Sequence, residues 1–276
     1  MKPAPFDFVR AETLEEALSA LAEAGDEARV IAGGQSLVPM LNMRLARPKV
    51  LVDIMGLADL DRIVETKGRI EIGAGVRQAT LARWAGLSEK LPLVAAALPW
   101  IGHAQTRSRG TVCGSLAHAD PSAELPLSLL VLGGEVRLRS RKKKRAVAAR
   151  DFFLGMMATA VEPGEMIQAV SLPVHAPGTG VAFQEVARRH GDFAIVACAA
   201  VAGPDGTCRL AVGGVADVPQ LVDLPDPESP EFDDAINEFA WSLNAREDLH
   251  ATARYRRELV RRIGRATIEE AIRCRG

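Results

Sequence analysis

The sequence predicts an α+β protein built in two parts. The chain has 276 residues, 48% of them hydrophobic and 25% charged, which suits a soluble globular protein of two ordinary domains. Short strand-like segments alternate with helical segments from the N-terminus to about residue 138, as in an α/β domain. A stretch rich in proline and glycine at 173–180 resembles a linker, and the strand-like and helical segments beyond it predict a smaller α+β domain.

The first elements in chain order are a short strand at 6–9 and an amphipathic helix. Thr13 and Glu16 have the spacing of a capping box, in which the threonine accepts from the amide of Glu16 and the glutamate reaches back. The helix ends at Gly25. Its apolar residues share one face and are Leu14, Ala17, Leu18 and Leu21.

The alternation continues through the middle of the chain. We expect strands at 28–32, 50–54 and 69–75, and helical segments at 37–45 (interrupted by Pro39), 80–84 and 92–101. The basic run at 139–145 predicts a solvated hairpin turn between strands at 135–138 and 146–148, with a partner-docking patch as the alternative.

The C-terminal part begins with three strand-like segments and ends in helices. The expected strands are 183–187, 194–202 and 208–215, with a Gly-Pro-Asp-Gly turn between the last two. The acidic, proline-rich segment 219–232 predicts a loop, and 254–262 and 263–272 predict charged amphipathic helices.

Composition excludes several classes of function. Lys and Arg total 34 and Asp and Glu total 35, so a net charge of -1 gives no electrostatic reason to expect nucleic acid or an anionic membrane as partner. No apolar run approaches the roughly 18 residues of a membrane span, and residues 1–7 do not resemble a secretory signal. The cysteines show no C-x-x-C spacing, which argues for a reducing cytoplasm and against a disulfide framework, an iron–sulfur cluster or a zinc site; they are Cys113, Cys198, Cys208 and Cys274.

A first candidate site is the strand-to-turn segment 30–37, Val-Ile-Ala-Gly-Gly-Gln-Ser-Leu. Paired glycines after a strand can turn several backbone amides toward one point, and such a nest suits a pyrophosphate. The segment has neither the lysine of a P-loop nor the G-x-G-x-x-G spacing of a Rossmann turn. Taken alone, it fits an ordinary strand-to-helix turn better.

A second candidate site is the segment 101–126, which is dense in small, polar and ionisable residues and predicts a long pocket-lining loop. The possible metal ligands in it match no zinc pattern; they are His103, Cys113, His118 and Asp120. Neither Ser36 nor Ser115 lies in a G-x-S-x-G sequence, so a serine nucleophile is not indicated.

Together the two segments resemble a known family. Residues 32–37 (Ala-Gly-Gly-Gln-Ser-Leu) and 111–121 (Thr-Val-Cys-Gly-Ser-Leu-Ala-His-Ala-Asp-Pro) look like the FAD-binding medium subunit of the molybdenum hydroxylases, of the carbon monoxide dehydrogenase and xanthine dehydrogenase type. The segments 151–155, 162–165, 188–194 and 255–262 agree, so the resemblance runs from near residue 6 to near residue 262.

The resemblance implies an architecture. It consists of a PCMH-like, two-subdomain α/β FAD-binding domain at 1–176, with subdomains of about 1–55 and 56–176. A C-terminal α+β domain at 177–276 follows, with a three-stranded antiparallel sheet and helices. FAD is expected to lie extended between these pieces, as is common for sites at domain interfaces.

The resemblance also implies cofactor-binding residues, with no catalytic acid or base and no metal ligand on this chain. Around the FAD pyrophosphate it implies Ala32, Gly33, Gly34, Gln35, Ser36 and Leu37. Toward the flavin it implies Thr111, Gly114, Ser115, Asp120 and Glu124 (the last on the ribityl hydroxyls), with Leu116 and Leu172 packing near the ring and Asp192 where the C-terminal domain closes.

Two positions depart from the family pattern. Cys113 stands where the family usually has a glycine, and we expect its side chain to point into the core as a small hydrophobe. A lysine common near the flavin is replaced by Gln184-Glu185, which affects tuning of the flavin potential rather than FAD binding.

By resemblance, the chain carries FAD and passes electrons from a partner to an external acceptor. A large subunit would hold the molybdenum cofactor and a small subunit two iron–sulfur clusters, in a dimer of heterotrimers. Two alternatives stay open: a stand-alone FAD-dependent reductase similar to the enolpyruvyl reductase of peptidoglycan synthesis, and an assembly subunit that has lost FAD.

Overall fold

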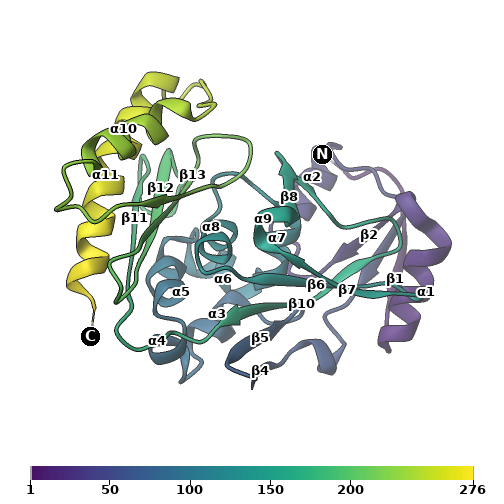
Figure 1. The fold of residues 1–276 in the computed structure, drawn as a ribbon. Coiled ribbons are helices and arrows are strands. Elements are labelled where there is room, and N and C mark those ends of the chain that lie inside the picture. Colours follow the sequence, from purple (N-terminus) through teal and green to yellow (C-terminus); the bar gives the residue numbers. More distant parts are fainter. Residues whose placement is uncertain (1, 276) are drawn as a thin grey trace.

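Four β-sheets and the helices packed against them make up the computed structural model, which describes residues 2–275 (Figure 1). The strands are β1 (Asp7–Arg10), β2 (Ala28–Ile31), β3 (Val50–Asp53), β4 (Ile63–Thr66), β5 (Arg69–Gly73), β6 (Glu135–Arg139), β7 (Lys144–Ala148), β8 (Phe153–Gly155), β9 (Ala158–Thr159), β10 (Met166–Pro173), β11 (Gly180–Val186), β12 (Val196–Ala202), β13 (Cys208–Gly213) and β14 (Gln220–Leu224). The α-helices are α1 (Leu14–Ala24), α2 (Leu37–Asn42), α3 (Gln78–Ala82), α4 (Leu87–Lys90), α5 (Pro92–Ala97), α6 (Ala104–Arg109), α7 (Val112–His118), α8 (Glu124–Val131), α9 (Ala149–Phe152), α10 (Phe232–Ser242) and α11 (Ala253–Arg273). None of the helices within residues 2–275 is long and apolar enough to cross a membrane.

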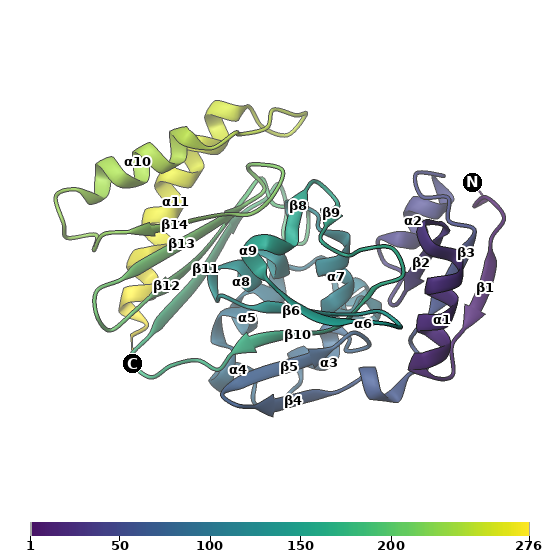
Figure 2. The ribbon, with the colours of Figure 1, turned by 45° about the vertical axis from the view of Figure 1, so that its right-hand side comes forward.

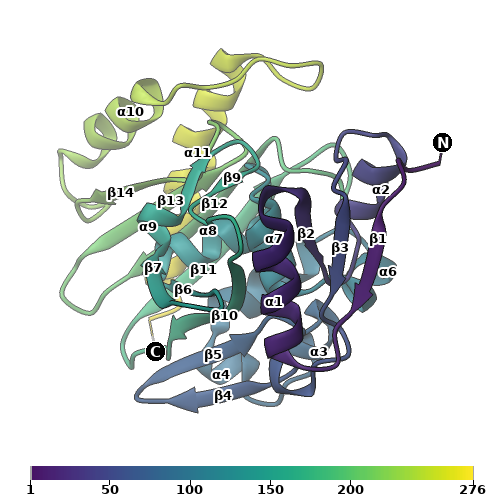
Figure 3. The ribbon, with the colours of Figure 1, turned by 90° about the vertical axis from the view of Figure 1, so that its right-hand side faces the viewer.

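The N-terminal end is a three-stranded parallel sheet, in the order β1-β3-β2, with α1 packed against it (Figure 3). The hydroxyl of Thr13 accepts a hydrogen bond from the amide of Glu16 at 3.2 Å. The Glu16 carboxylate accepts from the amide of Glu12 at 2.8 Å, one residue before the ideal capping-box partner. The expected start of the helix is therefore confirmed, and its expected end at Gly25 is confirmed as well.

A five-stranded antiparallel sheet, in the order β4-β5-β10-β6-β7, forms the middle of the molecule. Its central strand β10 pairs with β5 on one side and β6 on the other, although about a hundred residues lie between β5 and β10 in the sequence. The inserted chain includes the helices α3 to α8, and the second candidate segment, 101–126, lies among them.

Helix α8 lies between the central sheet and the C-terminal sheet and packs against both (Figure 2). All of its residues are buried. Leu125 and Leu129 belong to the core that includes the central sheet, whereas Leu127 and Val131 pack with Phe183 of the four-stranded sheet. Because both sides of the helix face protein, its sequence Glu-Leu-Pro-Leu-Ser-Leu-Leu-Val is apolar nearly all round.

The C-terminal sheet is antiparallel and has four strands, in the order β11-β12-β13-β14. The expectation of three strands, and of a loop over 219–232, was therefore wrong. The extra strand, Gln220–Leu224, lies at the edge of the sheet and alternates between more and less exposed residues. Prolines at 219, 225 and 227 flank it. Because prolines are typical of loops, a short edge strand between them is not apparent from the sequence pattern.

Two helical regions also differ from expectation. The segment 101–126 was expected to be one long loop, but α6, α7 and the start of α8 occupy most of it. Its small residues are compatible with short helices, and the side chain of Thr111 caps α7. The expected pair of C-terminal helices is one helix, α11, which runs unbroken through Gly264. A side chain at Gly264 would meet Leu210 at 2.9 Å, so the glycine lets α11 lie close to the sheet.

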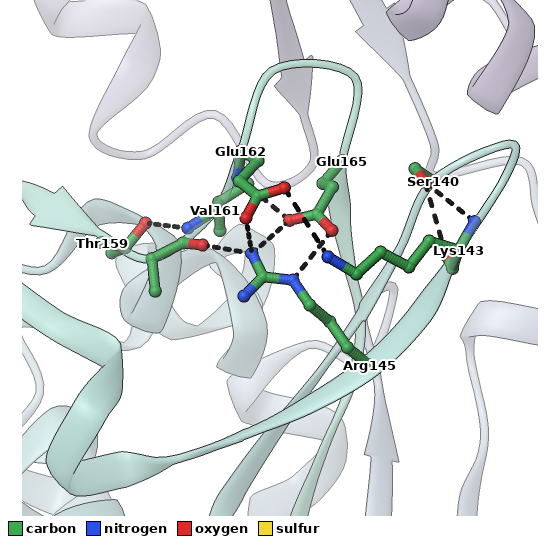
Figure 4. Close-up of polar contacts among 8 residues, drawn as sticks. Ser140, Lys143, Arg145, Thr159, Val161, Glu162 and Glu165 are labelled. Atoms are coloured by element: carbon green, nitrogen blue, oxygen red, sulfur yellow. Dashed lines mark hydrogen bonds and ion pairs between the residues drawn. The ribbon is translucent and has the colours of Figure 1, made fainter.

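The basic segment 139–145 forms the hairpin between β6 and β7, as expected, although the turn covers only 140–143 and β7 begins at Lys144 rather than at residue 146. Arg145, on β7, points toward the segment between β9 and β10, where its guanidinium donates to both carboxylate oxygens of Glu165, at 2.9 and 2.6 Å, and to the carbonyl of Ala160 (Figure 4). Glu162 adds ion pairs with Arg145 and Lys143. Part of the charge run is thus used within the fold.

Candidate functional site

The two glycine-containing segments, far apart in the sequence, meet in space. Gly33 follows β2 and lies against the backbone of Arg109 and Gly110, which directly precede Thr111. A Cβ added to Gly33 would overlap the carbonyl of Arg109 and come within 2.8 Å of the Gly110 Cα. Only glycine allows the two backbones to come this close, which explains why position 33 of the first segment is a glycine.

The rest of the first segment turns the chain into α2. Gly34 has a φ of 70°, in the left-handed region that glycine adopts most readily. The side-chain amide of Gln35 donates to the carbonyl of Gly33 at 3.1 Å. Ser36 precedes α2, its hydroxyl makes no capping bond, and Leu37 is the first residue of the helix.

The second segment is held beside the first by backbone bonds. Arg77 and Thr111 form an isolated antiparallel bridge, and the amide of Val112 donates to the carbonyl of Val76 at 3.0 Å. The hydroxyl of Thr111 caps α7 by accepting from the amide of Gly114 at 3.0 Å. Ser115 is partly exposed on the next position of the helix.

An open cleft with a volume of about 280 Å³ lies where the segments meet. Ala32, Gly33 and Gly34 form part of its wall. The other lining residues are Phe8, Ile31, Val38, Asp53, Met55, Arg77 and Arg109. The guanidinium groups of Arg77 and Arg109 make no hydrogen bond or ion pair with the residues described here, so both are free to meet an anion.

Asp120 and Glu124 lie at the far end of the second segment. The Asp120 carboxylate accepts from the amide of Ser122 at 2.8 Å. Glu124 is the first residue of α8 and is buried, with 7% of its surface exposed. Burial raises the pKa of Glu124 to about 7, an effect that Asp120 increases and Arg107 reduces.

The C-terminal part reaches the second segment at two places. The amide of Gly214 donates to the carbonyl of Pro121 at 2.7 Å. Gly191 has a φ of 86° and approaches His103 so closely that a Cβ there would lie 2.7 Å from the imidazole. Asp192, the next residue, is exposed on this connection.

Three apolar side chains from the sequence lie in the core rather than at the cleft. Cys113 is 2% exposed, with its thiol 3.6 Å from the carbonyl of Ile72, which confirms the expected core position. Burial raises the pKa of the Cys113 thiol to about 12, so it stays protonated. Leu116 and Leu172 line one small void together with Val112, so Leu172 lies beside the second segment but not at the cleft.

Sequence reasoning missed Arg77, Arg109, Asp53 and Phe8 as cleft residues. Arg77 follows the turn Gly73-Ala74-Gly75, and Arg109 precedes Gly110. A basic residue next to a glycine turn is the sequence feature that could have indicated these two arginines as anion-binding residues. Phe8 and Asp53 lie on neighbouring strands, and their proximity depends on the parallel pairing of β1 with β3.

The residues present fit a dinucleotide. Glycine backbone and two free guanidinium groups suit a pyrophosphate, and the Asp53 carboxylate could accept from ribose hydroxyls. Within residues 2–275, no three His, Cys, Asp or Glu side chains gather as ligands for a metal ion.

A family model described as the FAD binding domain in molybdopterin dehydrogenase matches residues 4–175. The chain belongs to the FAD-binding medium subunits of the molybdenum hydroxylases. It is 37% identical to the alpha subunit of the 6-hydroxypseudooxynicotine dehydrogenase complex of Paenarthrobacter nicotinovorans, over 99% of this chain and 96% of that protein. It is 36% identical to the carbon monoxide dehydrogenase medium chain of Afipia carboxidovorans, over 79% and 77%.

The structural similarity extends along the whole chain. A subunit in the structure of a cyanide-inactivated Cu,Mo-CO dehydrogenase matches with a TM-score of 0.93 and 32% identity, covering 99% of both chains. These findings confirm the predicted fold class and the family resemblance. The medium subunit is therefore an FAD-binding component of an oxidoreductase complex.

Proposed function

We propose that this medium subunit transfers electrons, accepting them from iron–sulfur clusters of a small partner subunit and passing them to an external acceptor. The observation that carries the proposal is the meeting of the two glycine segments beside a cleft with two unpaired arginines. FAD, when bound, supplies a ring that takes up and releases electrons singly or in pairs.

The pyrophosphate would lie against the segment from Ala32 to Leu37, with Gln35 and Ser36 offering side-chain donors. Arg77 and Arg109 would neutralise its charge. Toward the flavin end the proposed residues are Thr111, Gly114, Ser115, Asp120, Glu124 and Asp192. Leu116 and Leu172, which line one small void together, are proposed to pack near the ring.

The proposed division of the chain is an FAD-binding domain at 1–176, with subdomains of about 1–55 and 56–176, and a C-terminal domain at 177–276. Separate sheets and separate buried clusters support this division. The third cluster, between α5, α8 and the four-stranded sheet, would then be the interface between the domains.

The proposed partners are a large subunit with the molybdenum cofactor and a small subunit with two iron–sulfur clusters, in a cytoplasmic dimer of heterotrimers. The relatives' names support a multi-subunit complex, since they are called medium subunits or medium chains of dehydrogenases and hydroxylases. The stand-alone reductase and the flavin-free assembly subunit are the competing functions, and neither is favoured by a specific contact.

Titration of the purified full-length chain with FAD, followed by flavin fluorescence, tests the cofactor site. Replacing both Arg77 and Arg109 with Gln should weaken FAD binding by roughly tenfold or more, because two charge-assisted contacts to phosphate are lost. Arg83→Gln removes an exposed arginine near the end of α3 and is the matched control. Equal FAD affinity of the wild type, the double arginine variant and the Arg83→Gln control would contradict the site.

Electron transfer is tested separately, by measuring whether the partner subunits reduce the flavin bound to this chain.

A further inference from the structure

A buried arginine on the C-terminal helix bonds three separate parts of the chain. Arg256, on α11, is 2% exposed. Its guanidinium donates to the carbonyl of Ile195 at 2.6 Å and to the carbonyl of Gly214 at 2.8 Å. It also forms an ion pair with Asp248 at 2.5 Å. Burying a guanidinium is unfavourable unless its donors are bonded, so these contacts explain why an arginine is tolerated at this position.

Asp248 fixes the direction of the guanidinium. One of its carboxylate oxygens accepts from the amides of His250 and Ala251, at 2.9 and 3.0 Å, and the other accepts from Arg256. Burial acts to raise the pKa of Asp248, but the bonds from these amides and the charge of Arg256 outweigh it, and the pKa is lowered. The carboxylate is therefore charged at neutral pH and holds the arginine in place.

The two carbonyls that Arg256 bonds belong to different loops of the C-terminal sheet. Ile195 is the last residue of the loop between β11 and β12, and Gly214 is the first residue of the loop between β13 and β14. Gly214 has a φ of 78°, and a Cβ there would lie 2.8 Å from the carbonyl oxygen of Ile195. Glycine at this position therefore lets both loops converge on one guanidinium.

The same two loops contact the second segment. Gly191, in the loop between β11 and β12, packs against the imidazole of His103. The amide of Gly214 donates to the carbonyl of Pro121 at 2.7 Å. Arg256 thus joins the two loops through which the C-terminal part reaches residues 101–126.

We propose that Arg256 is a positioning residue for the cofactor site. By bonding the carbonyls of Ile195 and Gly214 it holds both loops against the second segment, and so sets where Asp120 and Asp192 lie. The part that concerns the cofactor rests on the proposed function, in which these two aspartates lie toward the flavin. Arg256 acts through the loops and not by contact with FAD.

Arg257, the next residue on α11, offers a matched comparison. Its guanidinium donates to the carbonyl of Leu243, at 3.2 and 3.0 Å, and lies over the ring of Trp241 at 5.5 Å. Arg257→Gln removes hydrogen bonds from the same helix to a backbone carbonyl, as Arg256→Gln does, but none of these contacts involves either loop. Loss of stability alone should therefore affect both variants, whereas loss of positioning should affect only Arg256→Gln.

The first experiment uses the full-length chain without FAD and measures hydrogen exchange of the Gly214 amide by NMR. In the wild type the carbonyl of Pro121 protects this amide. Arg256→Gln should accelerate its exchange by roughly twofold to tenfold, as expected when one hydrogen bond is weakened, and Arg257→Gln should leave it unchanged. Equal exchange in the wild type and in Arg256→Gln would overturn the role of Arg256 in holding the loops.

A second variant keeps the test decisive if Arg256→Gln does not fold. Asp248→Asn retains the arginine but removes the charge that directs it, so the Gly214 amide should again exchange faster than in the wild type, by a smaller factor. Glu247→Gln, at the neighbouring exposed position, is its control and should exchange as the wild type does. Exchange at the wild-type rate in Asp248→Asn would then overturn the proposal.

The second experiment measures FAD affinity and the visible circular dichroism of the bound flavin, at a temperature well below the unfolding midpoint of each variant. Arg256→Gln should weaken FAD binding by roughly threefold to thirtyfold and alter the flavin spectrum, because the loops move relative to the second segment. Arg257→Gln should match the wild type in both measurements. Wild-type affinity and spectrum in Arg256→Gln, or an equal loss in both variants, would overturn the positioning role.

The two experiments separate this proposal from the proposed function. If the wild type binds no FAD, the proposed function fails and the cofactor part of the positioning role fails with it. The exchange rates of the Gly214 amide still decide whether Arg256 holds the two loops against the second segment.

Discussion

Gly33 is the residue on which the contact between the two segments depends. Gly33→Ala would force the first segment away from Arg109 and Gly110, because no space exists for a Cβ. We expect a loss of about 1–3 kcal/mol in the free energy of unfolding and a loss of FAD binding. Gly56→Ala is a suitable control, since its Cβ would lie at an ordinary 3.7 Å from the carbonyl of Ala11. Urea unfolding and FAD titration measure the two effects, and full FAD stoichiometry in Gly33→Ala would contradict the site.

The four cysteines should differ in reactivity. Cys274 is exposed, whereas Cys113, Cys198 and Cys208 are buried, and burial raises the pKa of each buried thiol. Alkylation of the native chain near pH 8 should therefore modify Cys274 first, with the others reacting only after denaturation. Mass spectrometry of the tryptic peptides distinguishes these outcomes, and rapid native labelling of Cys113 would contradict its core position.

At the scale of the elements, the hairpin β6–β7 depends on the pair between Arg145 and Glu165. Burial acts to raise the pKa of Glu165, but the hydrogen bonds from Arg145 and from the amide of Glu162 outweigh it, and the pKa is lowered. The pair therefore stabilises the fold above the ordinary value of 4.5 and loses this effect as the pH falls.

Glu165→Gln should lower the free energy of unfolding by about 1–3 kcal/mol at pH 7, because a charge-assisted bidentate contact is lost. The difference from the wild type should shrink in acid, where the wild-type carboxyl is protonated too. Urea unfolding at both pH values measures it. Glu228→Gln, in the exposed loop before α10, provides a comparison, and an equal difference at both pH values would argue against the ion pair.

The local sequence pattern was sufficient for elements whose ends carry their own signals. The capping residue Thr13 and the stop at Gly25 define α1, and the basic turn between β6 and β7 follows from charge alone. The edge strand β14 and the short helices α6 and α7 depend on neighbours distant in the sequence, so no local period revealed them. The same limit applies to the site, where Arg77 and Arg109 enter only through the packing of Gly33.

At the scale of the whole molecule, the two proposed domains share α8. The four-stranded sheet covers apolar residues of two helices, which are Leu93 and Ala97 of α5 and Leu127 and Val131 of α8. A chain that ends after residue 176 would expose them to water, and an apolar surface of this kind favours aggregation. We expect the truncated chain to bind a hydrophobic dye and to associate, as measured by fluorescence and light scattering. A monomeric truncated chain that still binds FAD would show that the first domain folds independently.

The central position of β10 has a consequence for synthesis on the ribosome. Arg69 of β5 and Ser171 of β10 are joined by hydrogen bonds although they lie 102 positions apart. The middle strand of the sheet is thus made after both of its neighbours, at a few to about twenty residues per second. During that interval β5 and β6 each present an unpaired edge, which is the state most exposed to mispairing. Nascent chains stalled before residue 166 are therefore the ones expected to need a chaperone most.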